Sequence, residues 1–297
     1  MSQTSHATSP FRERHQYIAE YYRPSLVDRW RYRWQDRNRP IDFMVIGIAK
    51  CGTTWLSSRL DQIPEVQRSV PKEPHFFKFR WREKFEDWNV KKVRAIYLRR
   101  FWPHPRGKFL FEASPGYLSY PIIAHRIRKF YPATKFVVLL REPASRAYSH
   151  YNMWVRNGKI GIPFSDLVDE QLAIARTCLD HSGDEMENYY RLGIKRPQSM
   201  ITFGLYYLHL KAWLEVFPRA QVHILTIRQL RDPLAIGRML DFVGVGAGAV
   251  ADMGLDTPSR KREEPPMGPE VRSALQAFYE PYNQRLYDLL GVRELEW

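Results

Sequence analysis

The 297-residue sequence has little of what marks a membrane-spanning, disulfide-built or metal-stabilised protein. No apolar run approaches the roughly 20 residues that a helix needs to cross a bilayer. The two cysteines, Cys51 and Cys178, are too few for a disulfide scaffold, and we expect both thiols to be reduced. Cysteine and histidine nowhere form a C-x-x-C pair or a tight cluster, so we expect no bound metal.

Acidic residues are also few relative to basic ones: the sequence has 32 Asp and Glu against 46 Lys and Arg, which gives a formal net charge of +14. Such an excess favours an anionic partner: nucleic acid, a membrane surface, an anionic glycan or a phosphorylated cofactor. The sequence has no zinc-finger or RNP-type motif, so we expect no nucleic-acid partner. The first residues lack the apolar core of a signal peptide, and we therefore expect a cytoplasmic protein.

The most informative stretch that is present, FMVIGIAKCGTTWLS, runs from Phe43 to Ser57. Its apolar start predicts a buried strand at 43–47, and a glycine loop then leads into a helix predicted at 53–62. Backbone N–H groups and the dipole at a helix N-terminus attract phosphate, so we expect an anion site here. Thr53 and Thr54 are expected to cap this helix. The residues predicted to contact the anion are Lys50, Cys51, Gly52, Thr53, Thr54 and Trp55.

This loop is not a Walker A motif, G-x-x-x-x-G-K-[ST], because Lys50 precedes Gly52 by two positions. The difference weakens the hypothesis of a kinase that uses ATP and magnesium, and no acidic magnesium-binding motif is evident. We keep the kinase as an alternative. A second alternative is a non-enzymatic protein that binds polyanions or membranes through its basic N-terminal segment.

Two more stretches carry groups suited to a functional site. Prolines at positions 71 and 74 stiffen the backbone around Glu73 and His75, which favours a placed charge over an incidental one. The strand predicted at 135–140 ends at Arg141, and the helix that follows carries Ser149. In open α/β sheets ligands bind at the carboxyl ends of the strands, so we expect both anion-binding stretches at one edge of the sheet.

The whole pattern predicts an α/β fold, a single P-loop-like domain with a mainly parallel sheet and helices on both faces. Strands are expected at 43–47, 109–111, 135–140 and 222–226, and the main helices at 53–62, 83–100, 121–131, 203–217, 232–243 and 269–290. Residues 1–40 form a basic, aromatic N-terminal arm, either packed on the domain or in peripheral contact with a membrane. The domain itself spans 41–297, and its excursion at 158–200 is expected to lie beside an acceptor.

Taken in order, the motifs resemble those of sulfotransferases that use PAPS (3′-phosphoadenosine 5′-phosphosulfate), above all the heparan sulfate (glycosaminoglycan) type. The resemblance covers roughly residues 42–290. The segments that carry it are Gly47–Leu56 (the 5′-phosphosulfate loop), Lys72–Phe77 (K-E-x-H-F-F), Arg141–Tyr151 (R-x-P-x-x-R-x-x-S-x-Y), Gly204–Pro218 (G-x-Y-x-x-x-L-x-x-W-L-x-x-F-P) and Arg260, Lys261 and Arg262 (K-G-R-x-H-P). We name the last of these the late loop.

The resemblance implies an enzyme that moves the sulfuryl group of PAPS to an acceptor hydroxyl, with PAP as product and without a metal. It implies Glu73 as the general base, with His75 as the alternative because histidine serves in the cytosolic small-molecule branch. Lys50 would neutralise charge on the leaving 5′-phosphate, and Arg141 and Ser149 would grip the 3′-phosphate. The late loop would close over the nucleotide.

The resemblance further implies a carbohydrate or glycoconjugate acceptor, and the alternative is a small-molecule or lipid alcohol or phenol. Some positions depart from the family pattern. Ala113 stands where many eukaryotic relatives have a lysine, and Lys261 and Glu264 replace a glycine and a histidine in the late loop. The membrane anchor of the Golgi relatives is absent, so we expect a bacterial, cytoplasmic enzyme.

Overall fold

The computed structural model describes residues 39–79, 89–101, 108–179, 199–255 and 265–297. The N-terminal arm, the late loop and the second half of the 158–200 excursion therefore lie outside the described residues. The strands are β1 (Phe43–Val45), β2 (Val66–Arg68), β3 (Phe109–Ala113), β4 (Lys135–Leu140) and β5 (Val222–Thr226). The α-helices are α3 (Thr53–Leu60), α4 (Phe76–Phe79), α5 (Val90–Leu98), α6 (Pro121–Phe130), α7 (Pro143–Arg156), α8 (Phe164–Leu179), α10 (Ser199–Thr202), α11 (Tyr206–Val216), α12 (Pro233–Val243) and α13 (Pro269–Leu290). Short 3-10 helices are η3 (Arg99–Phe101), η4 (Arg219–Gln221), η5 (Gln229–Arg231) and η6 (Ala247–Met253).

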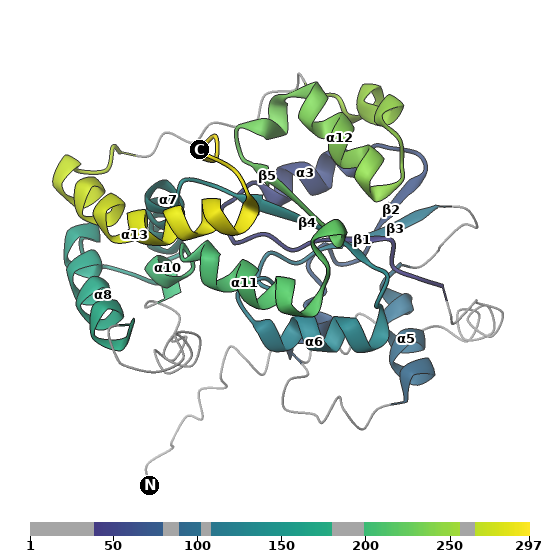
Figure 1. Cartoon of the computed structure of the whole chain (residues 1–297), viewed down its shortest axis with the longest axis horizontal. Helices are drawn as coiled ribbons and strands as arrows, with labels where there is room; N and C mark the ends of the chain where they lie inside the picture. The colour runs from purple at the N-terminus through teal and green to yellow at the C-terminus, as the bar shows by residue number, and fades with distance from the viewer. Residues whose placement is uncertain (1–38, 80–88, 102–107, 180–198, 256–264) are drawn as a thin grey trace, which may run out of the picture. The chain divides into compact units, whose positions relative to one another are not determined.

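The five strands form one parallel sheet in the order β2-β3-β1-β4-β5, which confirms the predicted fold class (Figure 1). Strand β2 was not among the expected strands, and it adds an edge beside β3. The central strand β1 pairs with β3 on one side and β4 on the other, so that Val45 lies opposite both Ala113 and Val137. The chain segments that follow β1 and β4 consequently begin at the same edge of the sheet.

Helices cover both faces of the sheet, as predicted. Figure 1 shows α3 and α12 above the strands, and α6 and α11 below them. The chain moves in one direction along the sheet from β1 to β2 and in the opposite direction from β3 to β4. Because crossovers between parallel strands are right-handed, these opposite moves place their helices on opposite faces.

The core is built on strands β1 and β4, whose side chains are almost all buried. The rings of Phe43 and Phe111, on neighbouring strands, stack with their centroids 5.1 Å apart. Such continuous apolar runs are expected of a parallel sheet that is covered on both faces.

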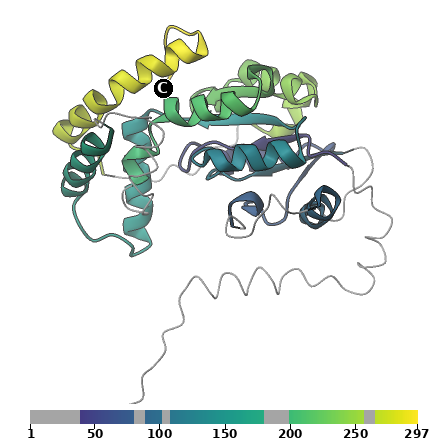
Figure 2. The same cartoon turned by 60° about the horizontal axis from the view of Figure 1, so that its bottom comes forward.

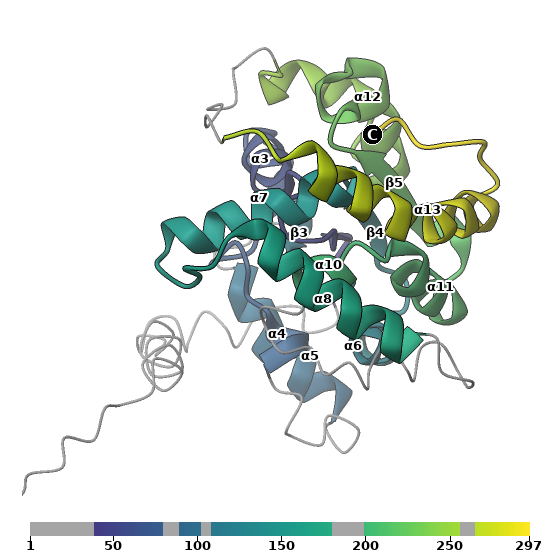
Figure 3. The ribbon, with the colours of Figure 1, turned by 90° about the vertical axis from the view of Figure 1, so that its left-hand side faces the viewer.

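A second apolar cluster joins α7, α8, α10 and α13 at one end of the sheet. Figures 1 and 2 show α13, in yellow, among the helices of this cluster, and Figure 3 views the molecule from the side on which the cluster lies. The 158–200 excursion was not expected to contain a long helix, yet its first half forms the 16-residue α8. Leu167, Val168 and Leu172 of α8 are buried in the cluster. None of the described helices combines the length and the apolar character that crossing a membrane requires.

Candidate active site

The segment between β1 and α3, residues 46–52, is here named the donor loop. At Gly47 a Cβ atom would lie 2.7 Å from the carbonyl oxygen of Leu139, so only glycine lets this loop pass against β4. Gly52 has a φ of 94° and lies within 2.6 Å, measured from an ideal Cβ, of Leu230 Cδ1. Lys50 also has a positive φ, 77°. The loop is therefore a tight turn that requires two glycines in order to pack between β4 and η5.

The expected threonine caps are wrong, because Gly52 occupies the N-cap position of α3 and no side chain caps this end. Thr53 and Thr54 are the first two helical residues; the side chain of Thr53 is buried and that of Thr54 is exposed. A glycine cap supplies no side-chain acceptor to the first N–H groups of the helix. This end of α3 therefore suits an anion that accepts from those groups.

Two other residues predicted in this loop have structural contacts. The Cys51 side chain is fully buried, and its Sγ lies 3.9 Å from the hydroxyl of Tyr206. Burial raises the pKa of this thiol. Trp55 is half-buried, with the Arg59 guanidinium 5.7 Å from its ring centroid. The Cys51 side chain is thus part of the hydrophobic core, and only the backbone of this residue could contact a ligand at the donor loop.

Arg141 follows β4 and lies against the donor loop, as the strand order predicts. Its Nη1 donates to the carbonyl oxygen of Lys50 at 3.4 Å, and its own carbonyl accepts from the Tyr206 hydroxyl at 2.8 Å. The expectation that the two stretches predicted to bind anions lie at one edge of the sheet is confirmed.

Helix α7 begins directly after Arg141 and carries the rest of the second motif. Glu142 caps the helix by accepting from the backbone N–H groups of Ala144 and Ser145, at 2.9 and 2.7 Å. Ser149 is buried on this helix, two turns from its start. The motif's second arginine, Arg146, is completely buried and donates to the carbonyl of Met200. Arg146 therefore fastens α10 to α7.

His150, next to Ser149, lies in strongly positive surroundings. Burial, followed by the charges of Arg146 and Lys50, lowers its pKa to about 3. The imidazole is therefore neutral at neutral pH. The influence of Lys50 also shows that the donor loop and α7 are electrostatic neighbours.

The late loop lies outside the described residues, but the chain that follows it reaches α7. The Tyr148 hydroxyl donates to the carbonyl oxygen of Pro265 at 2.9 Å. The chain leaving the late loop therefore contacts α7 one residue before Ser149, the predicted 3′-phosphate residue.

Glu73 and His75 lie together in the segment Lys72–Phe77, here named the base segment. Oε2 of Glu73 is 3.2 Å from Nε2 of His75, and Oε1 is 2.8 Å from Nζ of Lys72. Burial by itself would raise the pKa of Glu73. Hydrogen bonds from His75 and Lys72 outweigh burial and lower this pKa to about 2. Glu73 is thus ionised at neutral pH with both oxygens engaged.

Lys72 is a site residue that the sequence analysis did not select. Its Nζ also donates to Oγ1 of Thr54 at 2.9 Å, which connects the base segment to the first turn of α3. The available signal was its place directly before Glu73 in the K-E-P-H-F-F stretch. A neighbouring lysine is common by chance, however, and only the fold shows that it reaches Thr54.

A buried carboxylate behind the base segment was also missed. Glu112 on β3 is fully buried and accepts from the hydroxyl of Tyr97. Burial raises its pKa to about 7, although the hydrogen bond from Tyr97 and the charge of Arg100 act in the opposite direction. The hydroxyl of Tyr117 accepts from the backbone N–H of Phe77 at 3.2 Å. This hydrogen bond anchors α4, the helix that starts directly after His75. The signal was a glutamate within the apolar run FLFEA.

Among the described residues, no group of three or more His, Cys, Asp and Glu side chains is arranged to hold a metal ion. The Glu73 carboxylate instead has Lys72 as a cationic partner, and Arg141 lies against the donor loop that carries Lys50. Such an arrangement suits a reaction in which anionic groups are bound and a proton is removed.

The sulfotransferase domain family matches residues 40–253 of this chain, which is most of the fold. The chain belongs to the sulfotransferase family. A solved sulfotransferase from Alicyclobacillus acidocaldarius is 29% identical, with a TM-score of 0.64 over 86% of this chain and 96% of that one. The family and this structure agree with the resemblance drawn from the motifs.

Curated relatives are more distant in sequence. Over 86% of this chain, identity is 27% to human carbohydrate sulfotransferase 15 and 26% to mouse heparan sulfate glucosamine 3-O-sulfotransferase 6. It is 24% to the membrane-associated sulfotransferase kil1 of Dictyostelium discoideum. The matches cover 54%, 73% and 66% of those proteins, so the chain spans about half to three quarters of their length.

Proposed function

We propose that this sulfotransferase uses PAPS as donor and transfers the sulfuryl group to a hydroxyl of a carbohydrate or glycoconjugate. The observation that carries the proposal is the meeting of three parts at one edge of the sheet. These are the glycine-capped end of α3, Arg141 beside the donor loop, and Glu73 tied to α3 through Lys72.

The residues present fit a donor with two separate anionic ends. The N-terminal N–H groups of α3 and the Lys50 ammonium would hold the 5′-phosphosulfate, because a helix N-terminus and a nearby cation both favour negative charge. Arg141 and Ser149 would hold the 3′-phosphate. The late-loop residues Arg260, Lys261 and Arg262 are proposed to close over the nucleotide. The donor supplies an activated sulfuryl group with PAP as leaving group, and the cations make a metal unnecessary.

Within this arrangement Glu73 acts as general base and takes the proton of the attacking hydroxyl at one of its carboxylate oxygens. His75 is the second candidate for the base. Its Nε2 contacts Oε2 of Glu73, whereas Lys72 contacts Oε1. The low pKa of Glu73, about 2, guarantees the ionised form but weakens it as a base. Full basicity thus requires that Lys72 or His75 release part of its hold on Glu73.

The carbohydrate acceptor is supported by the family members that carry carbohydrate and heparan sulfate in their names. Sulfation of a small-molecule or lipid alcohol or phenol is the alternative. A screen of labelled PAPS against heparosan, chondroitin, simple sugars, lipid extracts and phenols separates these classes. Transfer to phenols or lipids, with none to any carbohydrate, would contradict the carbohydrate proposal.

The donor is tested by calorimetric titration of the protein with PAP and with ATP, both in EDTA. We expect PAP to bind in the micromolar range and ATP to bind at least tenfold more weakly. If ATP bound only after magnesium was added, and PAP did not bind, the kinase alternative would replace the PAPS proposal.

A further inference from the structure

One lysine outside the predicted site joins its two halves. Nζ of Lys72 lies 2.8 Å from Oε1 of Glu73 and 2.9 Å from Oγ1 of Thr54. Lys72 and Thr54 are 18 positions apart in sequence. The Lys72 side chain is only 18% exposed, so most of its length is packed against the protein. An exposed ion pair between sequence neighbours contributes little to stability. The contact with Thr54, however, links the base segment to α3.

The contact places the Lys72 ammonium at the N-terminus of α3, because Thr54 lies there. Thr54 is the second residue of α3, behind the glycine cap, where the partial positive charge of the helix is concentrated. A cation normally avoids that end. Lys72 is held there by the Glu73 carboxylate, and an anion bound to the first turn of α3 would be a second reason for its position.

The donor capacity of an ammonium leaves room for such an anion. Lysine has three N–H donors, and Glu73 and Thr54 account for two of the partners around Nζ. Lys50 lies two residues before the glycine cap of the same helix, so lysines from two segments are available to an anion there. An ammonium that binds both the base and this anion also fixes the distance between them.

We propose that Lys72 binds the 5′ end of the donor and, through its contact with Glu73, positions the base against it. The proposal rests on the proposed use of PAPS. On donor binding Lys72 shares its charge between Glu73 and the donor, and the proton affinity of Glu73 rises at the moment when it is needed. Glu73 is then a stronger base with donor bound than without it.

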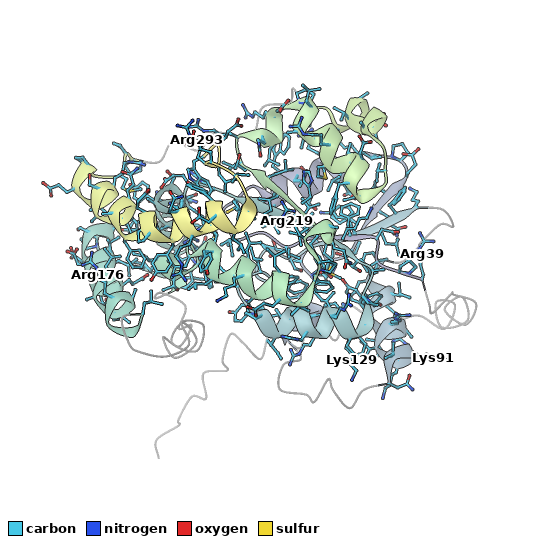
Figure 4. All side chains as sticks on the ribbon, viewed as in Figure 1. Arg39, Lys91, Lys129, Arg176, Arg219 and Arg293 are labelled. Atoms are coloured by element: carbon cyan, nitrogen blue, oxygen red, sulfur yellow. The ribbon has the colours of Figure 1, made fainter. Side chains whose placement is uncertain are left out.

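The test compares PAP with adenosine 3′-monophosphate, which lacks the 5′-phosphate. In Lys72→Met we expect PAP to bind about tenfold more weakly, while adenosine 3′-monophosphate changes less than twofold. Lys72→Arg should restore most of the affinity for PAP. The matched control is Lys91→Met, because Lys91 is an exposed lysine on α5, labelled in Figure 4, and both nucleotides should bind to it as to wild type.

A second variant approaches the contact from the other side. Thr54→Val removes Oγ1 and should weaken PAP by a few-fold, again with little effect on adenosine 3′-monophosphate. In the double variant Lys72→Met/Thr54→Val the two losses should not add, because they report one contact.

The outcomes separate the two proposals. If Lys72→Met lowered the affinity for both nucleotides equally, or for neither, the role of Lys72 would be overturned while PAPS use stood. If wild type bound adenosine 3′-monophosphate as tightly as PAP, no 5′ site would exist for Lys72. If wild type bound neither nucleotide, the proposed donor would fail and the role of Lys72 with it.

Discussion

Glu73 has an ionised side chain with a partner on each oxygen, and its substitution gives a sharp test of the chemistry. Glu73→Gln keeps the shape but cannot accept the acceptor's proton, so transfer from labelled PAPS should fall by about 10²–10⁴-fold. Binding of PAP should be at least as tight as in wild type, because a negative charge is removed from beside Lys72. Full activity of this variant would assign the proton to His75.

Arg141 is predicted to act at the other end of the donor. Arg141→Ala should weaken PAP by about 1–3 kcal/mol, the usual range for a lost charge-assisted contact. Binding of adenosine 5′-monophosphate, which has no 3′-phosphate, should change little. Arg293→Ala, at an exposed arginine labelled in Figure 4, is the matched control. Equal losses for both nucleotides would contradict the assignment of Arg141 to the 3′-phosphate.

Glu112 predicts a pH dependence of stability. Its pKa is about 7 in the folded protein against 4.5 for an ordinary glutamate. As pH rises between these values, Glu112 loses its proton in the unfolded chain but keeps it in the folded protein. The free energy of unfolding therefore decreases as pH rises. The penalty is complete above pH 7 and absent below 4.5.

Glu112→Gln removes that penalty. The unfolding free energy of the variant minus that of wild type should rise between pH 4.5 and 7, by on the order of 3 kcal/mol. Urea unfolding at several pH values measures this difference, from which other titrating groups cancel. A difference that does not vary with pH would show that Glu112 is ionised in the folded protein.

At the scale of an element, the donor loop depends on glycines for two different reasons. A Cβ at Gly47 meets backbone atoms of Leu139, which cannot move aside, whereas a Cβ at Gly52 meets the end of the flexible Leu230 side chain. We expect Gly47→Ala to lower the unfolding free energy by about 2 kcal/mol or more. Gly161→Ala, at a site with no atom within 4 Å, is the control and should change it little. Thermal denaturation followed by circular dichroism measures both, and equal effects would contradict the close approach.

The elements also show which sequence signals were sufficient. Strands β4 and β5 and helix α13 coincide with their predicted ranges: each strand is a mainly apolar run, and the helix begins at a proline and is followed by a glycine. Helix α8 was missed because its burial depends on α10 and α13, which are distant in sequence. The caps of α3 were mistaken because threonine is a common cap, whereas here the turn needs the positive φ that Gly52 adopts.

At the scale of the whole molecule, donor binding should be visible as stabilisation. If PAP binds only the folded protein, a concentration about 100 times Kd raises the unfolding free energy by about 2.7 kcal/mol. Differential scanning fluorimetry should therefore show a rise in Tm with PAP, and a smaller one with ATP at the same concentration. An unchanged Tm at millimolar PAP would count against the donor.

The sequence by itself determined the α/β class, the order of most elements and the motifs around Lys50, Glu73, Arg141 and Ser149, because these depend on local pattern and spacing. The strand order, which places β1 beside β4, was decided only by the tertiary structure. The same holds for the contact of Lys72 with Thr54 and for the burial of Glu112. Contacts of this kind join segments that are far apart in the chain, and the charge state of each group depends on what packs around it.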